Sequence, residues 1–162
     1  MLWNFIKPIL LFIPLASFQL VVIPLVSIDA ITPNLIIILI CFFTLKYGQM
    51  YGTLLGFVFG FIFDLISGSL LGAFMLSFTI SGFIAGYFFN ENKIEINTAT
   101  SEFIIIVFLS ATINSFLFNL VSSSYNEMNI FSLVLEGGIL PGLYTAFFAL
   151  PVILFNTRKE LR

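Results

Sequence analysis

The feature that most constrains this chain is a series of six long apolar runs, which fill most of its 162 residues. A helix needs about 20 apolar residues to cross a bilayer, so six crossings would leave only short loops. The runs are continuous, whereas the strands of a membrane β-barrel would alternate apolar and polar residues. We predict an all-α membrane protein, a bundle of six transmembrane helices in one domain. The expected spans are about residues 8–26, 34–45, 49–66, 70–89, 102–121 and 131–155.

Composition supports lipid as the solvent of the chain. Hydrophobic residues make up 60% of it and charged residues 9%, whereas a soluble domain carries roughly 25% charged residues. The net charge of −2 is too small to suggest a nucleic-acid partner. Cys41 is the single cysteine and there is no histidine, so neither an intrachain disulfide nor a His/Cys metal set is expected. We interpret the first apolar run as a retained helix rather than a cleaved leader.

The basic residues predict the orientation. The loops after the first, third and fifth spans contain no lysine or arginine, so basic residues alternate from one side to the other. The positive-inside rule then gives six spans with both termini in the cytoplasm, and a multi-pass protein of the plasma membrane. The basic residues are Lys7, Lys46, Lys93, Arg158, Lys159 and Arg162.

Small residues recur at every fourth position through the third span. Such spacing lets helix backbones approach closely in lipid, where packing replaces the hydrophobic drive. A second pair, Gly82 and Gly86, lies on the fourth span, and Gly138 and Gly142 on the sixth. We expect these faces to pack helices or to contact a partner, and a homodimer is an alternative use of them. The row consists of Gly48, Gly52, Gly56, Gly60, Asp64, Gly68 and Gly72.

Asp64 is the polar residue that most needs an explanation, because a charged side chain deep in a bilayer is energetically costly. It is either a binding or ion-site residue, or a local structural residue near the outer end of its span. We favour the structural role, with partial hydration and hydrogen bonds from Ser67 or nearby backbone N–H groups. At the start of the second span, Thr32 is the expected N-cap and Pro33 the first helical residue. Other polar residues within the spans are Gln19, Asn114, Asn119 and Glu136.

The stretch from Pro33 to Gly86 resembles the MreD family of bacterial rod shape-determining proteins. That family has a Pro-Asp-Leu-like start to a span, and here Asn34 replaces the aspartate. A glycine-rich helix then ends in Asp64 and is followed by Ser67-Gly68, Gly72, Gly82 and Gly86. The order Gly…Asp-x-x-Ser-Gly-x-x-x-Gly is more specific than hydropathy. Helix-packing or partner-interface candidates are Pro33, Asn34, Gly52, Gly56, Gly60, Asp64, Ser67, Gly68, Gly72, Gly82 and Gly86.

The resemblance implies a membrane scaffold of the cell-elongation complex that is not an enzyme. It would bind the bitopic protein MreC, and through it MreB and the peptidoglycan synthases, with membrane lipids around it and no cofactor. The sequence agrees, since it has no nucleophile–base set and no phosphate-binding motif. The family also resembles the six-helix substrate-binding subunits of energy-coupling-factor (ECF) transporters. The alternative is therefore a vitamin-binding subunit, with Asp64, Asn119, Glu136 and residues 122–124 as its polar candidates.

Overall fold

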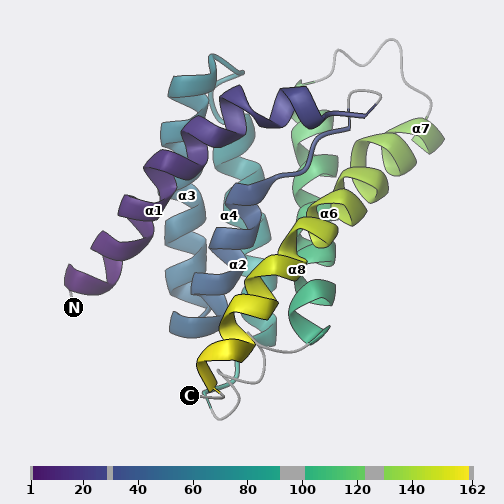
Figure 1. The fold of residues 1–162 in the computed structure, drawn as a ribbon. Helices are drawn as coiled ribbons and strands as arrows, with labels where there is room; N and C mark the ends of the chain where they lie inside the picture. Colours follow the sequence, from purple (N-terminus) through teal and green to yellow (C-terminus); the bar gives the residue numbers. More distant parts are fainter. Residues whose placement is uncertain (1, 29–30, 92–100, 123–129, 161–162) are drawn as a thin grey trace.

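The computed structural model describes residues 2–28, 31–91, 101–122 and 130–160, and it is helical throughout these ranges apart from short connections and one isolated bridge between Ile28 and Ile31 (Figure 1). Helices occupy the six segments in which spans are predicted. The last of them is one continuous rod made of α7, a π-helical turn η4 and α8. The elements are α1 (Leu2–Val21), η1 (Ile23–Val26), α2 (Leu35–Tyr47), α3 (Gln49–Ser67), α4 (Ala73–Ala85), η2 (Gly86–Phe88), α6 (Ser101–Ser122), α7 (Ile130–Val134), η4 (Leu135–Ile139) and α8 (Leu140–Glu160).

Within the described part of the chain, three helices are long and apolar enough to cross a membrane, namely Gln49–Ser67, Ser101–Ser122 and Ile130–Ile153. Three shorter apolar helices accompany them. α2 has only 13 residues, which corresponds to about 20 Å of helix and falls short of a bilayer core of about 30 Å. The chain reaches α2 through a non-helical stretch, residues 31–34. The shorter helices are Ile6–Val21, Leu35–Tyr47 and Ala73–Phe88.

α2 forms the centre of the molecule. It contacts α1, α3, α4, α6 and α8, and Ile36, Ile40 and Cys41 on it are fully buried. Figure 1 shows α1 and α8 crossing this group of helices obliquely. Both termini lie toward the same end as the C-terminal end of α2, which is the arrangement that the predicted orientation requires.

α3 and α4 form a tight hairpin through their glycines. A Cβ added at Gly56 would meet the backbone of Phe78, and one added at Gly60 would meet the backbone of Met75, each closer than the 3.0 Å that real Cβ contacts allow. Gly82 lies as closely against the carbonyl of Gly52. These glycines let the two backbones approach to a distance that any side chain would prevent.

The remaining glycines of the motif have a different role. Gly68 and Gly72 have positive φ angles of 66° and 100°, and no heavy atom lies within 4 Å of a Cβ built there. They shape the turn between α3 and α4, where the backbone enters the left-handed region that glycine adopts without strain. Gly86 lies against Gln49, so it closes the opposite end of the hairpin.

Candidate functional site

Asp64 lies at the closed turn of the α3–α4 hairpin and is only 1% exposed. Its carboxylate accepts hydrogen bonds from the backbone N–H groups of Gly72, Phe74 and Met75, at 2.9, 3.0 and 3.1 Å. The hydroxyl of Ser69 donates a fourth, at 2.9 Å. Asp64 therefore caps the first turn of α4 from the neighbouring helix, where the free N–H groups and the helix dipole favour a negative charge.

The structure changes two details of the predicted role of Asp64. The residue is buried rather than partly hydrated, and the serine that binds it is Ser69. Ser67 acts one step further out, because its hydroxyl donates to the Ser69 hydroxyl at 3.0 Å. The motif Asp-x-x-Ser-Gly-x-x-x-Gly thus describes a turn. Its glycines adopt the positive φ angles that the turn needs, and its aspartate accepts hydrogen bonds from the free N–H groups at the start of the next helix.

The start of α2 also differs from the prediction. Asn34, rather than Thr32, is the N-cap, and its Oδ1 accepts from Ile36 N at 3.1 Å and Ile37 N at 3.4 Å. Pro33 precedes the cap instead of opening the helix. The Asn34 backbone N–H donates to Thr145 Oγ1 on α8 at 2.9 Å. This contact joins distant parts of the chain and fixes where α2 begins. The residues next to Asn34 in the sequence therefore could not have predicted it.

Gln19 holds the non-helical stretch against α1. Its Nε2 donates to the Pro33 carbonyl at 2.8 Å, and its Oε1 accepts from Leu35 N at 2.9 Å. The amide thus replaces hydrogen bonds that a helix would have supplied. Such bonds are needed because lipid offers an unpaired backbone group no partner.

A π-helical turn lies opposite these groups. In η4 the carbonyl of Gly137 accepts from Asn119 Nδ2 at 2.9 Å, and the same amide nitrogen donates to Ser115 O at 3.0 Å. Gly137 leaves room for the amide, because a Cβ there would lie 3.1 Å from it. π-helical turns inside longer helices occur frequently at functional sites.

These elements enclose a polar cavity of about 280 Å³, called the polar cavity below. It lies where α1, the stretch before α2, α3, α4, α6, η4 and the start of α8 meet, close to the α3–α4 turn. Amide side chains and aromatic rings dominate its wall. Its lining residues are Gln19, Ile31, Thr32, Asn34, Phe63, Phe74, Asn114, Ser115, Phe118, Asn119, Glu136, Gly137 and Pro141.

Asn114 gives the polar cavity an unpaired polar group. The residue is 2% exposed, and its Oδ1 has no hydrogen-bond partner among the described residues. An unpaired buried acceptor costs about 1–3 kcal/mol. A buried polar group without a partner is therefore a candidate for binding something that enters the cavity.

The predicted polar candidates divide between the cavity and its surroundings. Asn119 and Glu136 line it, whereas Asp64 faces the first turn of α4. Ser122 is exposed at the end of α6 and donates to Phe118 O at 2.7 Å, and residues 123 and 124 lie outside the described residues. Within the described ranges, no cluster of three or more His, Cys, Asp or Glu side chains could hold a metal ion.

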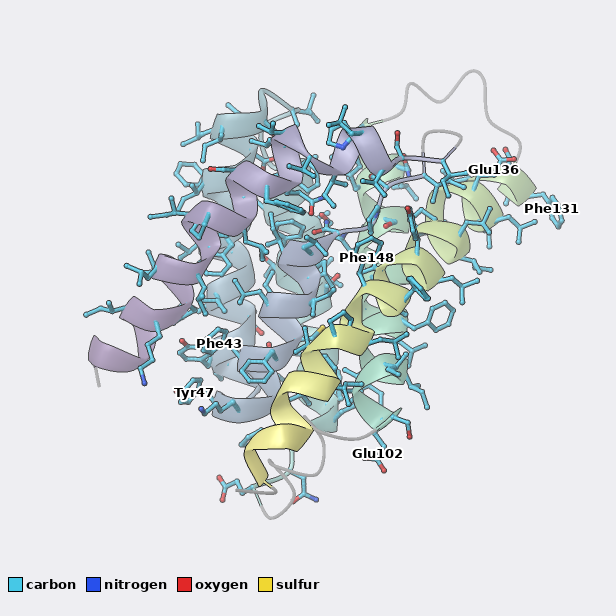
Figure 2. The ribbon with its side chains drawn as sticks, in the orientation of Figure 1. Phe43, Tyr47, Glu102, Phe131, Glu136 and Phe148 are labelled. Carbon is cyan, nitrogen blue, oxygen red and sulfur yellow. The ribbon has the colours of Figure 1, made fainter. Side chains whose placement is uncertain are left out.

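A second hollow, the apolar groove, has a volume of about 510 Å³. Its floor is α2 and its walls are α1 and α8, which run obliquely on either side of it (Figure 1). Figure 2 labels Phe43 on the α2 floor and Phe148 on the α8 wall. The groove shares no lining residue with the polar cavity. It is lined by Leu11, Leu15, Phe18, Leu35, Ile38, Leu39, Phe42, Phe43, Phe148 and Val152.

Comparison with known proteins connects this architecture to a family. No curated protein and no solved structure matches the chain, so the expected likeness to ECF-transporter subunits stays a prediction. The family model described as rod shape-determining protein MreD matches residues 1–158. That match covers nearly all of the chain, including every residue that lines the polar cavity. The chain therefore belongs to the MreD family of shape-determining bacterial membrane proteins, and its role is in determining rod shape.

Proposed function

We propose that this protein is a multi-pass plasma-membrane scaffold of the cell-elongation complex, with six spans and both termini in the cytoplasm. In this proposal it is not an enzyme. It binds an MreC-like bitopic protein and through it connects MreB to peptidoglycan synthesis. Membership of the MreD family supports the biological setting.

The observation that carries the docking proposal is the apolar groove. Gly52, Gly56, Gly60, Gly82 and Gly86 lie against the chain's own helices, so a partner helix would use another surface. The groove is lined entirely by apolar side chains, which come from α1, α2 and α8. A transmembrane helix is about 10 Å wide, and its association in lipid depends on packing of this kind. We therefore place the transmembrane helix of the partner between α1 and α8.

Leu11→Trp tests this placement, because it fills the groove from the α1 wall. Leu11 is 50% exposed, so the indole should not disturb the core. We expect the variant to lose most of the tagged MreC-like partner when the two are purified together in mild detergent.

Leu54→Trp is the matched control, since Leu54 is 53% exposed on α3 and does not line the groove. It should retain the partner at the wild-type level. Equal retention by both variants, at equal expression, would show that the partner helix binds elsewhere. A partner lost from both variants would point to a general sensitivity of the lipid-facing surface.

The polar cavity is the one observation that supports the alternative, a vitamin-binding subunit of an ECF-type transporter. Its volume lies near the lower end of ligand sites in proteins, which are roughly 300–1,000 Å³. A thermal-shift screen of the purified protein against vitamins tests this alternative. Stabilisation that saturates at micromolar vitamin would favour the carrier over the scaffold.

A further inference from the structure

The charges around the polar cavity point to the sign of a ligand. Among the described residues that line it, Glu136 is the one with a charge, and its side chain is exposed. The sequence contains no lysine or arginine in residues 8–45, 47–92 or 94–157. Every element that forms the cavity therefore lacks a positive side chain there. An anionic ligand would find no counter-charge, whereas a cation would find a carboxylate.

The hydrogen-bonding groups of the wall point the same way. Oδ1 of Asn114 is a buried acceptor without a partner among the described residues, so it needs a donor. The neighbouring amides are already engaged, because Gln19 binds Pro33 and Leu35, and Asn119 binds Ser115 and Gly137. Asn114 lines the polar cavity, and because its terminal side-chain torsion is soft, a rotation would turn the buried oxygen toward a donor there.

Aromatic rings complete the wall. Phe74 and Phe118 stack with their centroids 4.2 Å apart, and Phe63 meets Phe74 edge-on at 4.8 Å. All three line the polar cavity. The negative face of such a ring attracts a cation, whereas its positive edge does not. A carboxylate, an unpaired carbonyl oxygen and aromatic rings together are a set of groups that suits an organic cation.

We propose that the polar cavity binds a primary ammonium group carried on a short alkyl chain. The Glu136 carboxylate supplies the counter-charge, Asn114 Oδ1 accepts a hydrogen bond, and Phe74 and Phe118 contact the cation and its methylenes. Two sources share this chemistry: the ethanolamine head group of a membrane lipid, and a free small amine. The site is independent of the groove, so it stands whether or not the partner helix binds there.

Ligand-observed NMR of the full-length protein in a non-ionic detergent tests the proposal, with ethanolamine as the probe. We expect the binding of ethanolamine to saturate. Sodium acetate, measured as a control at the same ionic strength, should show no saturable binding. Glu136→Gln should weaken binding about tenfold, as expected for the loss of one charge-assisted hydrogen bond. Because Glu136 is exposed, this variant should fold, whereas Asn114→Leu is a second test with a greater risk to the core.

Glu102→Gln is the matched control. Glu102 is an exposed acid at the opposite end of the bundle from Glu136 (Figure 2), and its loss should leave ethanolamine binding unchanged. Binding that does not saturate, or that weakens equally in Glu136→Gln and Glu102→Gln, would show only a general attraction to an acidic protein. Either result would overturn the proposed site.

Native mass spectrometry separates the two sources. Protein from membranes that contain phosphatidylethanolamine should retain that lipid, and Glu136→Gln should lose it, if the ligand is the head group. Ethanolamine binding without lipid retention identifies a free amine. If neither ethanolamine nor the lipid binds, the polar cavity holds water and the proposal fails.

Discussion

Asp64 keeps its carboxylate inside the helical bundle because four donors from Ser69, Gly72, Phe74 and Met75 surround it. Asp64→Ala would leave three backbone N–H groups without their acceptor, two in the first turn of α4 and one at its N-cap, Gly72. We expect a loss of stability on the order of 3 kcal/mol. Thermal unfolding in detergent measures it.

Asp64→Asn should recover part of that stability, because an amide oxygen still accepts from the first turn of α4. Glu102→Ala removes an exposed acid and serves as the control, with a melting temperature close to that of the wild type. If Asp64→Ala melts with the control, the cap contributes little and Asp64 must serve another purpose.

At the scale of the elements, the α3–α4 hairpin depends on its missing side chains. Gly60→Ala adds one methyl group that must meet the backbone of Met75, so the helices have to separate. Overpacking of this kind costs about 1–3 kcal/mol. We expect a lower melting temperature and a lower yield of folded protein.

Gly138→Ala is the matched control for this hairpin. A Cβ at Gly138 would lie 3.5 Å from Phe116, which is ordinary contact, and the added methyl should be tolerated. Equal melting temperatures for Gly60→Ala and Gly138→Ala would contradict the close approach of α3 and α4.

The elements that hydropathy and local spacing determine could be predicted, and those that distant contacts determine could not. Continuous apolar runs locate the six helical segments, and the four-residue glycine spacing identifies the third as a close-packing helix. The start of α2 was placed wrongly, because Thr145 and Gln19 fix it from other helices. The π-helical turn at Leu135–Ile139 was missed for the same reason, since Asn119 binds its carbonyl. A sequence signal did exist in the Glu136-Gly137-Gly138 triplet, whose glycines fit a closely approached backbone.

At the scale of the whole molecule, the proposal fixes the orientation of the protein in the membrane. If all six segments cross the membrane, the α3–α4 turn and the polar cavity lie on the extracytoplasmic side, opposite both termini. Reporter fusions test this claim: one that is active only outside the cytoplasm should work after Gly68 and fail at the C-terminus. Activity at both positions would require an even number of spans between them, whereas the proposed arrangement has three, and would therefore contradict it.

Disulfide cross-linking in native membranes tests the central claim, that the apolar groove receives the partner helix, most directly. Leu11→Cys lies in the groove and Leu54→Cys at an exposed position of α3 outside it, each in a Cys41→Ala background. Single cysteines along the transmembrane helix of the MreC-like partner complete the pairs. We predict cross-links to Leu11→Cys at helical spacing along the partner and none to Leu54→Cys. Cross-links to Leu54→Cys alone, with the complex intact, would contradict the account.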